Sequence, residues 1–335
     1  MKPSVLKESL KIAIQARLPV LIVGKPGIGK SDIVGQACAE LDADLITDYP
    51  AVSDPTDYKG LPMPDTDGVS AHFRPFGNLM KLINAKKPTV FFEDEIGQAP
   101  DAVQKALMHL NLARHVNGTK ISDFVTIVAA TNRRADRAGV TGLLETVKSR
   151  FASILNLEPD VDDWVTWALT HDMPVELIAH NRFRPEYISM TNWKPSPDMV
   201  NSASPRTISR VGLWMKTNPA PGLEYELYAG AAGEAYAADL LGFLKIFRNL
   251  PSIDRIIMAP DTEKIPTDPA TLYAVCAALT GKASDQTFAN IVKYANRMTP
   301  EFSVMLIRDI TSKDRKLVNT KAFIDWSTKH SKVLI

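Results

Sequence analysis

Short apolar runs alternate with helix-like segments through the first half of the chain. Val20–Val23 is apolar at every position, which is typical of a strand buried on both faces of a sheet. Comparable runs cover Leu45–Thr47, Thr89–Phe92 and Phe124–Ala130, and a weaker one covers Ser153–Leu157. Between them, apolar residues recur every three or four positions, as on one face of a helix. The alternation predicts a parallel sheet wrapped by helices.

One helical segment precedes these runs, and two further helical segments and one long irregular segment lie between them. Apolar residues repeat at helical spacing over Val5–Ile14 and from Lys30 onward. A third helix is predicted over Pro100–Val116. Its end is placed at Val116 because the following pair, Asn117-Gly118, commonly ends a helix in the left-handed conformation. Residues 50–79 are rich in Pro, Asp and Gly. We expect a long loop there, of the kind that carries function or lacks order.

Beyond residue 159 the pattern becomes helical throughout. All five tryptophans lie after residue 160, and no apolar run of comparable strength recurs. Helical periodicity is strongest over Ile208–Met215, Leu223–Phe247, Ala270–Leu279 and Phe288–Tyr294. We therefore expect an α/β core over residues 1–159, a helical domain with a proline-rich connector over 160–249, and a C-terminal helical region of unknown role over 250–335.

Composition and charge narrow the class of protein. The 39 Lys and Arg residues against 38 Asp and Glu leave a net charge of +1, which disfavours a broad electrostatic grip on nucleic acid. Cys38 and Cys276 lie far apart in apolar stretches, so a reducing compartment is favoured over a disulfide framework. Charged residues interrupt positions 1–18, and no apolar run approaches the ~20 residues that span a bilayer. We expect a soluble, cytoplasmic protein with no membrane partner.

Residues 24–31 match the phosphate-binding pattern G-x-x-x-x-G-K-[ST] at every specified position. The segment follows the apolar run Val20–Val23 and opens a predicted helix, where backbone N–H groups can surround phosphate oxygens. Lys30 would reach the β- and γ-phosphates, and the Ser31 hydroxyl would bind Mg²⁺. The candidate nucleotide-binding residues are Gly24, Lys25, Pro26, Gly27, Ile28, Gly29, Lys30, Ser31 and Asp32.

Two further apolar runs end in polar residues that suit the same chemistry. The first ends in the acids at 93–95, where Asp94 would hold hydrated Mg²⁺ and Glu95 would deprotonate the attacking water. Three adjacent acids there are costly without a cation or a basic partner. The second run, residues 125–131, is followed by Asn132. In a phosphate-loop sheet this strand can lie between the other two, which would bring Asn132 close to the γ-phosphate.

These three segments together resemble an AAA+ ATPase, with Walker A at residues 24–31, Walker B at 90–95 and sensor 1 at Asn132. The resemblance covers about residues 18–215. It implies a P-loop NTPase fold: a doubly wound parallel sheet, then an α-helical lid, with a helical C-terminal region after it. It also implies Mg²⁺-dependent ATP hydrolysis.

More narrowly, the chain is similar to the MoxR-like branch of that class, which is dynein-related and of AAA_5 type. Residues 57–60 (DYKG) are similar to its tDllG segment, and residues 94–99 (DEIGQA) to its DEInrA segment. Residues 72–79 resemble its f-x-pGpL segment, with Asn78 where the family has Pro. The resemblance implies a homo-oligomeric ring, commonly a hexamer, with ATP at subunit junctions. It implies a chaperone-like remodelling of a protein client, which in this group is often a von Willebrand factor A-type domain protein.

Two arginines match positions that the family uses for catalysis. Arg150 stands where such proteins have the arginine finger, which acts on ATP bound by the neighbouring subunit. Arg206 matches sensor 2 at the start of a lid helix. Arg133 and Arg134, directly after sensor 1, are rival candidates for the role of the finger.

Other functions stay open at this point. A nucleic-acid-stimulated motor or loader could use the same core, although the near-neutral charge disfavours it. An ATP-gated binding or scaffold module with little turnover is also compatible, although the complete Asp94-Glu95 pair disfavours it. A small-molecule kinase is less favoured still, because it would have no use for sensor 2 or a trans-acting arginine.

Overall fold

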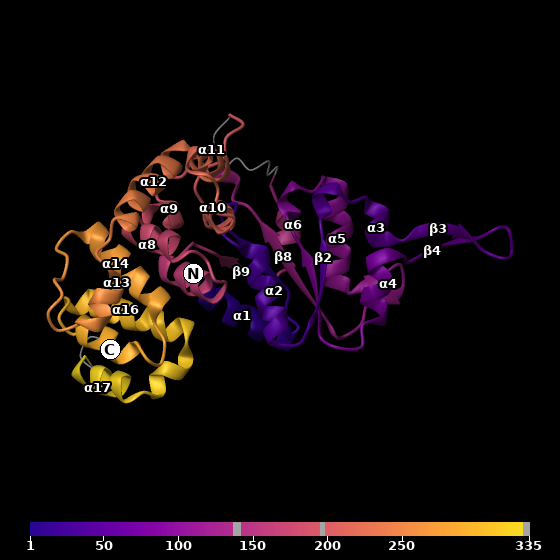
Figure 1. The fold of residues 1–335 in the computed structure, drawn as a ribbon. Helices are drawn as coiled ribbons and strands as arrows, with labels where there is room; N and C mark the ends of the chain where they lie inside the picture. The colour runs from indigo at the N-terminus through magenta and orange to yellow at the C-terminus, as the bar shows by residue number, and fades with distance from the viewer. Residues whose placement is uncertain (137–141, 195–197, 331–335) are drawn as a thin grey trace. The chain divides into compact units, whose positions relative to one another are not determined.

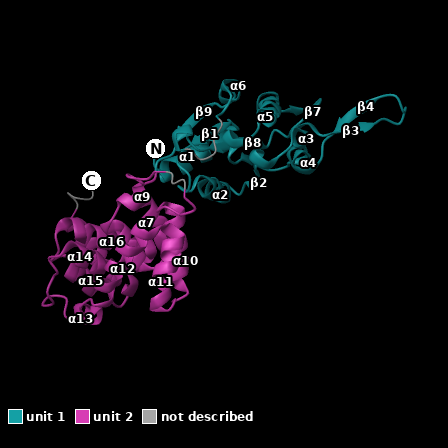
Figure 2. Ribbon diagram, turned by 90° about the horizontal axis from the view of Figure 1, so that it is seen from above, with its two compact units in different colours: residues 1–158 teal, residues 159–335 magenta. Residues whose placement is uncertain are grey.

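The computed structural model describes residues 1–136, 142–194 and 198–330. The chain forms two compact units, Met1–Glu158 and Pro159–Ile335 (Figure 2). Each unit contains apolar cores of its own. The predicted boundary near residue 250, inside the second unit, stays a prediction.

The first unit is built on a five-stranded parallel sheet with the strand order β2-β5-β8-β1-β9. Its strands are β1 (Val20–Val23), β2 (Asp44–Asp48), β5 (Thr89–Glu93), β8 (Val125–Thr131) and β9 (Ser153–Asn156). Each strand lies within one residue of its predicted range at either end. β8 lies between β5 and β1, as expected, so the three motif-bearing strands are neighbours.

Helices cover both faces of this sheet (Figure 1). They are α1 (Pro3–Ala16), α2 (Lys30–Glu40), α3 (Pro55–Lys59), α4 (Gly77–Asn84), α5 (Asp101–Ala113) and α6 (Glu145–Lys148). The Thr126 hydroxyl of β8 donates to the Ile14 carbonyl of α1, 3.2 Å away, on one face. The next residue, Ile127, packs in the core that contains Leu107 of α5 on the other face. The prediction of a doubly wound parallel sheet is confirmed.

Residues 50–79 are folded, where the sequence predicted a long loop. They contain a 3₁₀ turn η1 (Pro50–Val52), α3 and the antiparallel hairpin of β3 (Leu61–Pro64) and β4 (Ala71–Arg74), before α4 begins. The Asp54 side chain caps α3 by accepting from the Thr56 N–H at 2.9 Å. The hairpin extends from the body of its unit (Figure 1), and its strand residues are exposed. Proline and aspartate therefore mark capped, hydrogen-bonded turns here.

The helix predicted over Pro100–Val116 is shorter than expected. α5 ends at Ala113, because Arg114 has φ 54° and closes the helix. The chain then forms a small hairpin of β6 (His115–Val116) and β7 (Thr119–Lys120). Asn117 and Gly118, at φ 43° and 86°, form the two-residue turn of that hairpin. The same pair of residues can end a helix or join two strands, and here it joins strands.

The described residues of the second unit form helices and no strand. The helices are α7 (Val161–Thr170), α8 (Val175–Phe183), α9 (Glu186–Ser189), α10 (Pro205–Lys216), α11 (Pro221–Ala232), α12 (Glu234–Arg248), α13 (Ile253–Met258), α14 (Pro269–Lys282), α15 (Phe288–Ala295), α16 (Pro300–Lys313) and α17 (Lys321–Lys329), with a 3₁₀ turn η4 (Arg315–Asn319). The single helix predicted over Leu223–Phe247 is divided at Gly233. Gly233 has φ 93°, and a Cβ there would meet the Asn201 carbonyl oxygen at 2.8 Å.

Candidate nucleotide-binding site

The loop between β1 and α2 has the backbone that a phosphate-binding loop requires. Gly27 and Gly29 have φ 77° and 89°, a region that residues with side chains seldom adopt. Gly24 is buried, and a Cβ there would lie 2.8 Å from the Leu157 carbonyl oxygen. Gly29 is the N-cap of α2, so the first N–H groups of that helix face the loop. Ile28 is buried beneath the loop, and Asp32 lies exposed in the first turn of α2.

Lys30 is enclosed by this loop and contacts the predicted sensor. Its Nζ donates to the carbonyl oxygens of Gly24 and Lys25 at 3.0 and 2.9 Å, and to Asn132 Oδ1 at 2.7 Å. Only 8% of Lys30 is exposed. These partners hold the ammonium group at the loop, where it could also donate a charge-assisted hydrogen bond to a phosphate oxygen.

The hydroxyl of Ser31 and the carboxylate of Asp94 lie together. Ser31 Oγ donates to Asp94 Oδ2 at 2.6 Å, and Asp94 Oδ1 accepts from the Glu95 N–H at 3.0 Å. Hydroxyl and carboxylate oxygens are the ligands that Mg²⁺ prefers, with water and phosphate completing its octahedron. The pair of oxygens therefore fits the divalent cation that the sequence predicts.

Glu95 has an unusual backbone conformation. At φ 58° and ψ 31° it lies in the left-handed region, and the residue is exposed. Such conformations in residues other than glycine cost free energy and are concentrated at functional sites. The turn separates the Glu95 side chain from the strand and begins the 3₁₀ turn η2 (Ile96–Gln98).

Glu93 differs from Asp94 and Glu95 in its environment and its protonation state. It is fully buried, and Asn111 Nδ2 donates to its Oε2 at 3.0 Å. Burial raises its pKa to about 8, against the hydrogen bond from Asn111, so the carboxyl is neutral near pH 7. The expected crowding of three charges is thus relieved by protonation of Glu93, with no basic partner involved. β5 is buried at every position and Glu93 is its last residue, so a predicted strand longer by one residue would have placed Glu93 in the interior.

The candidate arginines differ in how their side chains are held. Arg133 is bound within its own unit, at 3.0 and 3.1 Å to the Asp136 carboxylate and 3.1 Å to Glu158. Arg134 is exposed at the start of the 3₁₀ turn η3 (Arg134–Asp136). Arg150 follows α6, and its buried Nε has no hydrogen-bond partner among the described residues.

Arg206 belongs to the second unit, in the first turn of α10. Its helix is capped by Ser204, whose hydroxyl accepts from the Thr207 N–H at 3.3 Å. Arg206 itself is exposed. Its role toward a nucleotide stays a prediction.

Among the described residues, no group of His, Cys, Asp and Glu has the arrangement of a metal site. Within the described ranges, no helix is both long and apolar enough to cross a bilayer.

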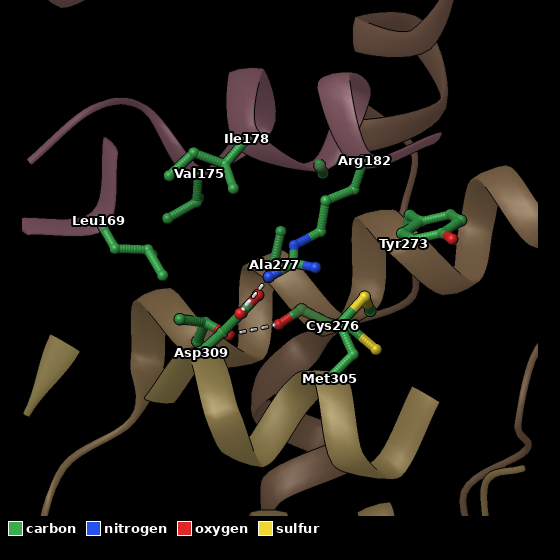
Figure 3. Close-up of a pocket in the computed structure, with 11 residues that line it drawn as sticks. Leu169, Val175, Ile178, Arg182, Tyr273, Cys276, Ala277, Met305 and Asp309 are labelled. Carbon is green, nitrogen blue, oxygen red and sulfur yellow. Dashed lines mark hydrogen bonds and ion pairs between the residues drawn. The ribbon is translucent and has the colours of Figure 1, made fainter. Parts of the chain in front are cut away.

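A small cavity of about 10 Å³ lies in the second unit between α7, α8, α14 and α16 (Figure 3). Its volume suits one water molecule at most.

Neither a family model nor a curated protein matches the chain. Among solved structures it is similar to RuvB of Thermotoga maritima, a Holliday junction branch migration motor, at 17% identity over 82% of this chain and 81% of that chain, with a TM-score of 0.40. A mutant of the same RuvB gives 18% identity, 83% and 82% coverage and a TM-score of 0.42. It is also similar to NtrX from Brucella abortus, at 13% identity over 92% of this chain and 67% of that chain, with a TM-score of 0.38. Likenesses at this level concern the fold alone.

Proposed function

We propose that the chain is a Mg²⁺-dependent ATPase of the AAA+ class. The observation that supports this best is a pair of contacts, Lys30 to Asn132 at 2.7 Å and Ser31 to Asp94 at 2.6 Å. They join residues from three separate segments at the carboxyl edge of one sheet, which is where open α/β sheets bind ligands. The whole set needed to bind a triphosphate and activate water is then within one unit.

Each side chain has a role in this proposal that follows from its chemistry. Lys30 and the N–H groups of the loop bind the β- and γ-phosphates of ATP. Ser31 and Asp94 hold Mg²⁺, which when bound would neutralise charge on the phosphates. Glu95 accepts the proton of the attacking water, and the Asn132 amide orients that water.

Arg150 is proposed to act in trans, on ATP bound by a neighbouring subunit. Its Nε lacks a partner within the described chain, whereas Arg133 is paired with Asp136 and Glu158. An arginine in this role is worth about 10³ to 10⁵ in rate. Arg206 is proposed to sense the γ-phosphate from the lid. Ring assembly and the remodelling of a protein client, with a von Willebrand factor A-type domain as one candidate, follow from the MoxR-like resemblance.

The substitution Glu95→Gln tests the proposed chemistry. It keeps the size of the side chain and removes the proton acceptor, so ATP binding should persist while turnover falls by about 10²- to 10⁴-fold. Binding is measured by equilibrium titration with a fluorescent ATP analogue, and turnover by phosphate release. Glu8→Gln, at an exposed glutamate of α1, is the matched control and should change neither quantity. Normal turnover by Glu95→Gln would remove Glu95 from the mechanism.

The same assay separates the two other functions that the sequence leaves open. Turnover that rises on adding single- or double-stranded nucleic acid would favour a motor or loader. ATP binding without turnover, in the intact chain at any concentration, would favour an ATP-gated scaffold.

A further inference from the structure

The carboxylate of Asp48 joins two helices to the end of a sheet strand. Asp48 is the last residue of β2. Its Oδ2 accepts from the Tyr58 hydroxyl of α3 at 2.5 Å, and its Oδ1 accepts from Asn78 Nδ2 of α4 at 3.2 Å. One side chain therefore contacts two helices, through Tyr58 and Asn78, which are twenty residues apart in sequence.

These two helices, α3 and α4, flank the exposed hairpin β3–β4 in the chain. α3 ends at Lys59, directly before β3, and α4 begins at Gly77, shortly after β4 (Figure 1). The two ends of the hairpin are packed backbone against backbone. A Cβ on Gly60 would lie only 2.5 Å from the Arg74 carbonyl oxygen. Movement of the hairpin must therefore act on α3 and α4 together.

The backbone of Asp48 holds the proposed magnesium ligand. The Asp48 carbonyl accepts from the Asp94 N–H at 2.9 Å, and Asp48 lies opposite Glu93 in the register of β2 and β5. Asp94 in turn contacts Ser31. Two hydrogen bonds and one residue thus separate the helices that carry the hairpin from Asp94.

The hydrogen bond between the Tyr58 hydroxyl and the Asp48 carboxylate is favoured by the burial of Tyr58. Only 4% of Tyr58 is exposed. Burial, together with the bond to Asp48, raises the pKa of the Tyr58 phenol above its usual range, so it remains a donor at any ordinary pH. A buried donor that loses its acceptor bears the full cost of desolvation, which favours the bonded arrangement.

We infer that Asp48 is a positioning residue that couples the β3–β4 hairpin to the proposed magnesium ligand Asp94. A ligand that displaces the hairpin shifts α3 and α4, these shift the end of β2 through the Asp48 carboxylate, and the Asp48 carbonyl shifts Asp94. The hairpin is then a regulatory input to turnover. This inference rests on the proposed function for its effect on turnover, but the mechanical link itself does not.

The link can be tested without nucleotide by amide hydrogen exchange. Tyr58→Phe and Asn78→Ala each remove one bond to Asp48 and touch no proposed catalytic residue. We expect amide exchange in residues 93–96 to become about threefold to tenfold faster in each, the effect of losing one hydrogen bond. Thr56→Val in α3 and Asn84→Ala in α4 remove local bonds that do not involve Asp48, and they should leave this segment unchanged. Unchanged exchange in Tyr58→Phe and Asn78→Ala would overturn the inference.

A second measurement separates positioning from a general loss of stability. The affinity for a fluorescent ATP analogue is compared in EDTA and in Mg²⁺. A displaced Asp94 should lower the gain from Mg²⁺ about threefold to tenfold in Tyr58→Phe and Asn78→Ala, with the affinity in EDTA unchanged. A merely structural role would weaken both affinities equally, and that result would contradict the inference.

A double-mutant cycle completes the test. In an Asp48→Ala background, Tyr58→Phe should have no further effect on exchange or on the Mg²⁺ gain, because its acceptor is already gone. Additive effects would overturn the coupling through Asp48. If the intact chain binds no nucleotide, the proposed function fails, and the exchange measurement still decides whether the link exists.

Discussion

At the scale of single residues, three consecutive acids occupy three different environments. Glu93 is buried and neutral, Asp94 is bonded to Ser31, and Glu95 is exposed after a left-handed turn. Only the latter two can then serve a cation and a water. The backbone conformation places the three carboxylates in these different environments. Residue types alone would make them equivalent.

The loop glycine Gly24 gives a direct residue-scale prediction. In Gly24→Ala the new Cβ would lie 2.8 Å from the Leu157 carbonyl oxygen and 2.6 Å from Ile28 Cδ1. The Ile28 side chain can rotate away, but the backbone of Leu157 cannot, so the loop must shift. We expect a loss of about 1 to 3 kcal/mol in unfolding free energy and weaker ATP binding. Chemical denaturation and nucleotide titration measure the two effects.

Gly35 is the matched control for this change. It lies inside α2, and a Cβ there would meet nothing within 4 Å. Gly35→Ala should therefore stabilise the protein by about 0.5 to 1 kcal/mol, as an unstrained alanine does in a helix. A destabilised Gly35→Ala with a normal Gly24→Ala would contradict this account of the loop.

At the scale of elements, a buried ion pair ties α8 to α16 in the second unit. Arg182 reaches from α8 to Asp309 of α16 beside the small cavity (Figure 3). α14 also packs against α8. Burial raises the pKa of Asp309 to about 6, although Arg182 acts in the opposite direction. The helices after residue 250 are thereby joined to those before it.

This pair predicts how stability depends on pH. Between about pH 4 and pH 6 the unfolded chain loses the Asp309 proton while the folded protein keeps it, so unfolding free energy falls as pH rises. Arg182→Met removes the charge that lowers this pKa, and the fall should then continue above pH 6. We expect a loss of about 3 to 5 kcal/mol at pH 8 and a smaller loss at pH 5. Denaturant melts at the two pH values measure it.

Arg308→Met provides the comparison for that variant. Arg308 is half exposed and pairs with exposed Asp162 at 2.7 Å, and it lowers the pKa of Asp309 less than Arg182 does. Its removal should cost less than about 1 kcal/mol at either pH. An equal loss in both variants, or a loss in Arg182→Met that shrinks with rising pH, would show that the buried pair does not behave as described.

At the scale of the whole molecule, the proposed trans arginine makes activity depend on assembly. If Arg150 completes the site of a neighbour, specific ATPase activity should rise with protein concentration until assembly is complete. Glu95→Gln and Arg150→Ala should each hydrolyse ATP far more slowly than the unmodified chain when assayed alone. Mixing them should restore part of the turnover, because an intact Glu95 can then face an intact Arg150.

Steady-state phosphate release across a dilution series and across mixing ratios measures both effects. Arg133→Ala is the informative comparison, because its side chain is already paired within its own unit. If Arg133→Ala complements Glu95→Gln and Arg150→Ala does not, Arg133 is the trans-acting residue. Absence of complementation by any of them would exclude a shared site.

Local sequence determined much of this protein. Strand positions followed from continuous apolar runs, since such runs are buried on both faces of a sheet. The phosphate loop followed from its glycines and lysine, because positive φ and a cation are properties of single residue types. These signals act over a few residues, so they can be detected without the fold.

Tertiary structure decided what depends on contacts between distant residues. The meeting of Lys30 with Asn132, the neutral state of Glu93 and the role of Asp48 all depend on which strands are neighbours. Sequence could suggest the order of β5, β8 and β1 but carried no sign of the Asp48 contacts, and Asn78 was visible only as a departure from a family pattern. The Asn117-Gly118 turn was ambiguous for the same reason. A local pattern fits more than one structure, and the free energy of packing selects between them.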